Sequence, residues 1–198
     1  MTTLLQRSTF VVEQRRKLFE MRNQYRLFDE TGATIGTVEQ VQQSALTFLA
    51  RFVTDLDVAL PVTLEVADET GGAALVLHKP WFSMTLSVAL PDGTPLGKII
   101  KRLRMGKARF TLVDANGAEV GEVRAENWRA KDFAVFDGSG NEVARVAKQW
   151  RGLATELFTD ADTYVVQLTP AAVEPLRSLA LAASLAIDVV MKQKDYGS

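Results

Sequence analysis

The sequence predicts a mainly β protein (α+β) in which a closed antiparallel barrel of about twelve short strands surrounds one apolar helix. Two observations predict this fold: a recurring strand-turn-strand unit along most of the chain, and a nearly uninterrupted apolar run over residues 175–191. A chain of 198 residues with 47% hydrophobic residues is long enough to bury the core of one domain. We therefore expect a single domain over residues 1–198.

The recurring unit is a β-type run, an acid-and-glycine turn, and then an apolar residue followed by a small one. Each unit predicts a β-hairpin, because Asp and Asn side chains bond nearby amides in turns and Gly accepts a positive φ. An open sheet of so many strands would expose its edges, so closure is expected. The turns are Asp29-Glu30-Thr31-Gly32, Asp68-Glu69-Thr70-Gly71, Pro91-Asp92-Gly93, Asp114-Ala115-Asn116-Gly117 and Asp137-Gly138-Ser139-Gly140, and the apolar-small pairs are Ile35-Gly36, Leu96-Gly97, Val120-Gly121 and Val143-Ala144.

The apolar run predicts a helix from Pro175 to about residue 192, with proline in its first turn. Its polar residues share one narrow stripe at 100° per residue, and those residues are Arg177, Ser184, Asp188 and Lys192. Between Arg177 and Asp188 the uncharged run rises about 15 Å, roughly half of the ~30 Å hydrocarbon core of a bilayer. We therefore expect the centre of the barrel for this helix rather than a membrane span.

Two further segments have a structural interpretation. Residues 43–56 carry apolar side chains at helical spacing, which predicts a helix on the barrel wall. His78, the only histidine, precedes a turn at Pro80, and we expect Trp81 and Phe82 beyond it to enter the core. No Gly-x-Ser-x-Gly motif accompanies Ser83, so we expect no catalytic triad, no catalytic residues and no enzyme.

Charge and composition limit the classes of function. The net charge is −1, so we expect no nucleic-acid binding by the chain as a whole. The chain has no cysteine, and Met1 to Phe10 lack the apolar segment of a secretory signal. We therefore expect a soluble, cytoplasmic protein.

The strongest functional candidate is a basic hairpin over residues 98–109, which contain six Lys or Arg and no acid. A two-residue turn at Met105-Gly106 would place Arg104 opposite Lys107 and Arg102 opposite Arg109. Like charges directly opposite destabilise a sheet, whereas an anionic partner would gain from them. We therefore predict lipid binding by these four residues. The alternative, a solvated face with acids from neighbouring strands between the cations, stays open.

Several strings resemble the phospholipid scramblases and LURP-one-related proteins over nearly the whole chain. They are Phe10-Val11-Val12, Lys17-Leu18-Phe19-Glu20, Leu96-Gly97, Phe110-Thr111-Leu112, Lys148-Gln149-Trp150-Arg151-Gly152, Glu156-Leu157-Phe158-Thr159-Asp160-Ala161-Asp162 and Ala186-Ile187-Asp188. The resemblance implies a tubby-like fold, a barrel of about twelve strands around a central helix. It also implies a calcium loop beginning at Asp160 and Asp162, but the later acids of that loop are replaced by Tyr164, Val166, Leu168 and Ala171. We expect no cofactor, with calcium at Asp160 and Asp162 as the less favoured alternative.

Together these features predict a non-enzymatic tubby-like module that binds anionic phospholipid or phosphoinositide peripherally, at the inner face of the plasma membrane. Two alternatives remain open. One is a phospholipid scramblase that moves lipid between leaflets. The other is a ligand-binding or scaffold protein of unknown role.

Overall fold

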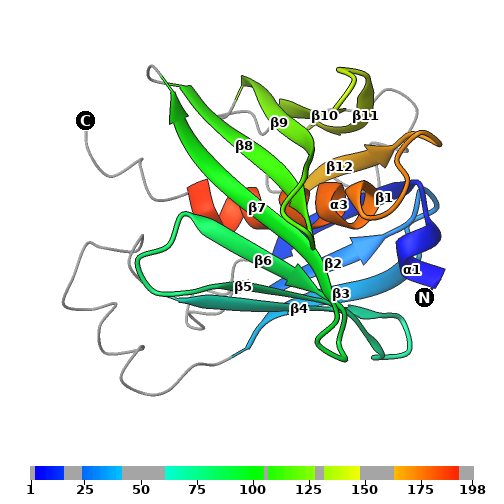
Figure 1. Cartoon of the computed structure of the whole chain (residues 1–198). Helices are drawn as coiled ribbons and strands as arrows, with labels where there is room; N and C mark the ends of the chain where they lie inside the picture. The colour runs from blue at the N-terminus through cyan, green and yellow to red at the C-terminus, as the bar shows by residue number, and fades with distance from the viewer. Residues whose placement is uncertain are drawn as a thin grey trace, which may run out of the picture.

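The computed structural model describes residues 3–15, 24–41, 61–104, 107–127, 132–147 and 163–191, and it confirms the predicted closed barrel (Figure 1). Each strand pairs antiparallel with the next, and β1 closes the sheet by pairing with β12, so no strand of the described chain has a free edge. The strands are β1 (Thr9–Arg15), β2 (Gln24–Phe28), β3 (Thr34–Gln40), β4 (Val62–Asp68), β5 (Ala73–Lys79), β6 (Thr85–Ala89), β7 (Pro95–Arg104), β8 (Lys107–Asp114), β9 (Glu119–Asn127), β10 (Asp132–Asp137), β11 (Glu142–Ala147) and β12 (Thr163–Leu168), and the helices are α1 (Thr3–Gln6) and α3 (Leu176–Met191).

Helix α3 runs through the barrel, as its composition predicts (Figure 1). It begins one residue after Pro175 and ends at Met191, within a residue of the predicted bounds. Four alanines let the strands approach it closely, and all four are buried: Ala180, Ala182, Ala183 and Ala186. The helix therefore forms the centre of the core, and the strands supply the surrounding layer.

Two residues of the predicted polar stripe of α3 are described, Arg177, which is half-buried, and Ser184; the side chain of Asp188 and residue Lys192 lie outside the described residues. Ser184 is buried, and its hydroxyl donates to the Leu181 carbonyl at 2.6 Å. Ser178 is also buried, and its hydroxyl and amide both donate to the Glu174 carboxylate, at 3.0 and 3.2 Å. The buried hydroxyls of the helix thus have acceptors nearby and do not require water.

The five acid-and-glycine turns form tight hairpins at one end of the barrel. In four of them the first Asp accepts hydrogen bonds from amides two and four residues later, as Asp137 does from Ser139 at 2.9 Å and Asn141 at 2.8 Å. A side-chain hydrogen bond from Asn141 and backbone amides lower the pKa of Asp137. The remaining turn, between β6 and β7, differs, since Leu90 holds the first position and the Asp92 carboxylate accepts from the Thr94 amide at 2.8 Å. The turn residues thus have the predicted local roles.

The glycines at positions 36, 97 and 121, which follow three of the turns, mark points where another part of the chain closely approaches the barrel wall. A bulge shifts the register one residue before Gly97 and Gly121. A methyl group on Gly97 would collide with the Val113 carbonyl and lie 3.2 Å from the Leu179 side chain of α3. At Gly121 the corresponding neighbours are Phe136 and Leu176. Glycine is therefore required at these two strand positions, where a neighbouring strand and α3 both lie close to the backbone.

We predict that Gly97→Ala destabilises the protein by about 3 kcal/mol or more, because the added carbon meets rigid backbone at a φ of +152°. Urea denaturation measures this loss. Gly138→Ala is the matched control, since no atom lies within 4 Å of the added carbon, and its effect stays within about 0.5 kcal/mol. Equal stabilities for the two variants would contradict the close approach of wall and helix.

Arg177 joins the start of α3 to the N-terminal segment. Its Nε donates to the Leu5 carbonyl at 2.8 Å, and its Nη2 donates to the carbonyls of Gln6 at 2.9 Å and Arg7 at 2.6 Å. Leu5 and the preceding Leu4 are buried in the core. The guanidinium fork therefore satisfies the last carbonyls of α1 and holds that helix over the end of the barrel.

We predict that Arg177→Ala lowers the free energy of unfolding by about 2–4 kcal/mol, because three charge-assisted hydrogen bonds are lost together. Amide hydrogen exchange should accelerate at residues 4–7 before it does in the strands. Arg145→Ala serves as the control, since the Arg145 side chain is exposed enough for water to screen its pair with Glu142 at 2.6 Å, and it should cost less than about 1 kcal/mol.

Candidate functional site

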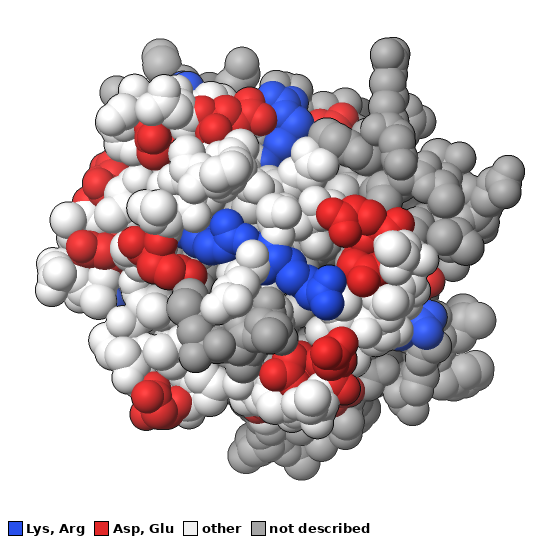
Figure 2. Space-filling model, turned by 90° about the vertical axis from the view of Figure 1, so that its right-hand side faces the viewer, with Lys and Arg blue, Asp and Glu red and all other residues white. Residues whose placement is uncertain are grey.

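The two ends of the barrel differ in charge. The turns β2–β3, β4–β5, β6–β7, β8–β9 and β10–β11 all lie at one end, which we call the acidic end. Figure 2 shows acidic side chains spread over this side of the molecule, with a few basic ones near its centre. Its turn acids are Asp29, Glu30, Asp68, Glu69, Asp92, Asp114 and Asp137. This end does not suit an anionic partner.

The opposite end, which we call the basic end, carries residues 79–84 and the β7–β8 hairpin. The register pairs Arg102 with Arg109 and Arg104 with Lys107, as the sequence predicts. Arg102 and Arg109 are exposed. On the other face of the hairpin, Ile99, Phe110 and Leu112 are buried in the core. Met105 and Gly106 lie outside the described residues, as do the side chains of Arg104 and Lys107.

One acid partly balances the hairpin. Glu122 on β9 lies 3.4 Å from Arg109 and also bonds Arg124, whose guanidinium stacks over the Phe136 ring at 4.2 Å. A single carboxylate is thus shared by two arginines, so their cluster keeps a positive charge. Within the described part of the chain, no carboxylate lies within ion-pair distance of Arg102. The alternative prediction is a solvated face with acids from neighbouring strands between the cations. Among the described residues, Glu122 is the one acid that meets this prediction.

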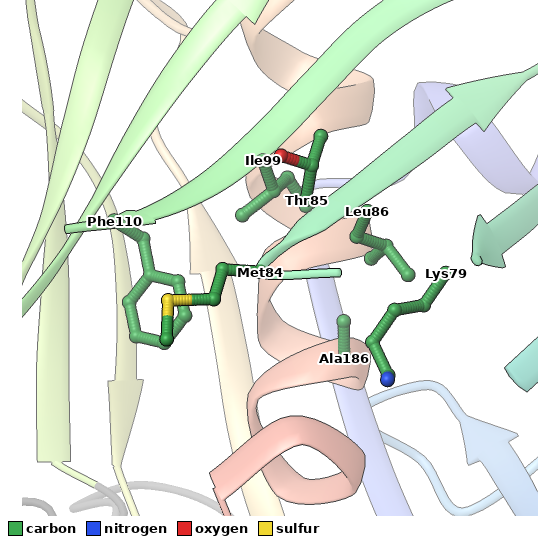
Figure 3. A pocket seen from close by; sticks show the side chains of 7 residues that line it. All are labelled: Lys79, Met84, Thr85, Leu86, Ile99, Phe110 and Ala186. Carbon is green, nitrogen blue, oxygen red and sulfur yellow. The ribbon is translucent and has the colours of Figure 1, made fainter. Parts of the chain in front are cut away.

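A small apolar pocket opens beside the hairpin, between the strands and α3 (Figure 3). Lys79 lines it from the end of β5 and is only 2% exposed, and this burial lowers the pKa of its ammonium group. Figure 3 shows the Lys79 amine beside Ala186 of α3, with Met84 and Phe110 further along the wall. The other lining residues are Thr85, Leu86 and Ile99. The pocket thus combines apolar walls with one cation at its border.

The prediction that Trp81 and Phe82 enter the core is wrong. Trp81 is 49% exposed and Phe82 is 78% exposed. Lys79 takes the last inward position of β5, and Phe82 adopts a φ of 51°, which is rare for a bulky residue. The aromatic pair therefore stands outside the barrel at its basic end. The alternation of strand positions does not determine where these rings point, because β5 ends at Lys79 and both residues lie in the loop after it.

The remaining candidate residues do not form a catalytic or metal site in the described ranges. His78 Nδ1 lies 3.0 Å from the Thr63 hydroxyl, and Ser83 hydrogen-bonds only Thr85, two residues away. Across these ranges no three His, Asp or Glu side chains gather as metal ligands. Asp160 and Asp162, together with the predicted helix over 43–56, lie outside the described residues.

A closed antiparallel barrel around a central helix is the tubby-like fold that the sequence predicts. A family model described as Scramblase matches residues 1–193, and the chain belongs to that family. A solved structure from Arabidopsis thaliana has the same fold, with a TM-score of 0.54 and 13% identity over 94% of this chain and 93% of the other.

Three curated relatives resemble the chain at low identity. Altered inheritance rate of mitochondria protein 25 of Saccharomyces cerevisiae is 24% identical over 84% of this chain and 60% of its own length. Phospholipid scramblase 1 of Rattus norvegicus is 23% identical over 68% of this chain and 44% of its own. A phospholipid scramblase family protein of Schizosaccharomyces pombe is 24% identical over 84% and 47%. The chain therefore spans about half the length of these relatives. Among the described helices, none has the length and apolar character needed to cross a bilayer.

Proposed function

We propose that this scramblase-family barrel is a non-enzymatic module that binds anionic phospholipid or phosphoinositide through its basic end. The observation that carries the proposal is the pairing of Arg102 with Arg109 and of Arg104 with Lys107 on one hairpin. Four cations held opposite one another cost the sheet stability, and an anionic surface offsets that cost. The names of the rat and fission yeast relatives, which refer to phospholipid scramblases, support a lipid as the partner.

The electrostatics favour weak and reversible attachment. Each cation near an anionic bilayer contributes about 1 kcal/mol, and salt at about 0.1 M screens charges beyond roughly 10 Å. The Glu122 carboxylate offsets part of the contribution of Arg109. We place the interaction at the inner face of the plasma membrane, where anionic lipids create a negative surface potential.

We predict that Arg102→Gln with Arg109→Gln weakens binding to phosphoinositide-containing vesicles about thirtyfold at low salt, the equivalent of two cations. Reversing Arg102, Arg104, Lys107 and Arg109 to Glu should abolish binding. Vesicle co-sedimentation measures both, and circular dichroism confirms folding.

Arg26→Gln with Arg145→Gln is the matched control for this experiment. Both control residues lie on strands away from the hairpin, β2 and β11, and the change in net charge is the same. The control should bind like the unaltered chain. Equal losses in the two double variants would mean that net charge, rather than the hairpin, governs binding, and a wild-type chain that never binds these vesicles would refute the proposal.

Lipid translocation between leaflets is the second candidate function, favoured by the family match over residues 1–193. Unlike surface binding, translocation along α3 requires a change in the fold, because Leu179 and Leu185 of α3 are fully buried within the barrel. A lipid groove along α3 would need the wall to open.

If the chain translocates lipid, fluorescent lipid from the inner leaflet of reconstituted vesicles should reach the outer leaflet. A membrane-impermeant quencher added outside should then quench more than the outer-leaflet fraction of the fluorescence. The Gly97→Ala variant supplies a comparison, because its barrel wall is less tightly packed. If opening of the wall limits lipid translocation, this variant should translocate lipid at a different rate. Protection that equals that of protein-free vesicles, with and without calcium, eliminates this function.

A further inference from the structure

The loop between β5 and β6 exposes an unusual amount of apolar surface. Trp81, Phe82 and Met84 are 49%, 78% and 48% exposed, within a loop of five residues, 80–84. A protein surface seldom leaves adjacent large apolar side chains in water unless they meet another molecule. The loop is therefore a candidate contact surface, distinct in chemistry from the charged hairpin beside it.

The loop is built to hold these side chains outward. Phe82 has a φ of 51°, a conformation that costs a bulky residue free energy and persists only where the surroundings impose it. The Ser83 hydroxyl supplies one restraint, since it accepts the Thr85 amide at 3.0 Å and donates to the Thr85 carbonyl at 3.2 Å. The rings of Trp81 and Phe82 lie 6.2 Å apart between centroids. The aromatic pair is thus a preformed tip.

The loop lies directly beside the basic hairpin. The Lys101 amide donates to the Met84 carbonyl at 2.9 Å, so the chain at Met84 runs alongside the residues that lead to Arg102. Four of the five exposed large apolar side chains of the described ranges are at the basic end, namely Val41, Trp81, Phe82 and Met84. The fifth, Val173, precedes α3 at the acidic end. Among the described residues, exposed apolar and cationic groups are therefore combined at the end opposite the acid-rich turns.

We infer that Trp81 and Phe82 insert into the interfacial layer of an anionic bilayer while the basic hairpin contacts the lipid headgroups. This inference rests on the proposed function and adds to it an apolar anchor and an orientation, with the basic end toward the membrane. Tryptophan and phenylalanine suit this layer, because they bury a large apolar area at the boundary between headgroups and chains. A bilayer supplies both an anionic surface and an apolar layer beneath it, in the same geometry as the hairpin and the loop.

The test uses the whole chain with phosphatidylcholine vesicles, with and without phosphatidylserine, and a variant that removes both rings. Trp81→Ser with Phe82→Asn is suitable, because Asn tolerates a positive φ and keeps the turn. We expect this variant to bind phosphatidylserine vesicles about tenfold less tightly, since two large apolar contacts are lost. Its remaining binding should be released fully by high salt. Val173→Ser, an exposed apolar change at the acidic end, should bind like the wild type.

Tryptophan fluorescence tests insertion separately from affinity. Brominated phosphatidylcholine should quench the wild-type chain on vesicles, and Trp81→Phe should remove most of that quenching while retaining most of the binding. Unquenched tryptophan, or equal binding by the wild type and the Trp81→Ser/Phe82→Asn variant, overturns the inference and points to a protein partner for the loop.

The two proposals fail in different ways. In one outcome, binding is lost when Arg102 and Arg109 are neutralised but is unaffected by the changes at Trp81 and Phe82. This result supports the proposed function and contradicts insertion of the loop. Quenching that persists on neutral vesicles in high salt supports the loop and removes the requirement for anionic lipid. Absence of binding both to phosphatidylserine vesicles and to phosphoinositide-containing vesicles rejects both.

Discussion

The packing of helix α3 against the inner wall of the barrel is the constraint on which the rest of the fold depends. Leu176 and Leu179 reach the wall where Gly121 and Gly97 leave no side chain in the way. The bulges beside these glycines place two successive wall positions toward the helix, and the alanines of α3 allow the strands to close around it. The diameter of the barrel therefore depends on small residues on both sides of this contact. A larger residue at Gly97, at Gly121 or at one of the α3 alanines would push the strands and the helix apart.

Closure of the sheet also determines which residues meet at each end. In an up-and-down barrel alternate connections fall at opposite ends, so the acid-and-glycine turns gather at one and the β5–β6 loop and β7–β8 hairpin at the other. The chain thus acquires a charge asymmetry that its net charge of −1 conceals. The topology converts a periodic sequence into a molecule with two chemically different ends.

Much of the fold could be predicted from local sequence, because turns and helical periodicity depend on near neighbours. The hairpin turns, the extent of α3 and the pairing of Arg102 with Arg109 are all confirmed. Features that depend on distant contacts could not be predicted. The helical periodicity puts Arg177 in a polar stripe, whereas its guanidinium bonds carbonyls at residues 5–7. Trp81 and Phe82 lie in a loop beyond the end of β5, where strand alternation no longer applies, and both are exposed. The lipid-binding role of the four cations remains a prediction, as does calcium at Asp160 and Asp162.

The bonds between Arg177 and the N-terminal segment join residues up to 172 positions apart in sequence. The same is true of the seam, where Thr9 pairs with Gln167. During synthesis β1 therefore cannot pair with β12 until nearly the whole chain has been made. The inner face of the strands likewise remains without α3 until then. The apolar lining of the strands stays uncovered over that interval. The order in which the parts emerge therefore leaves the nascent strands open to misassociation until the last strand and α3 have been made.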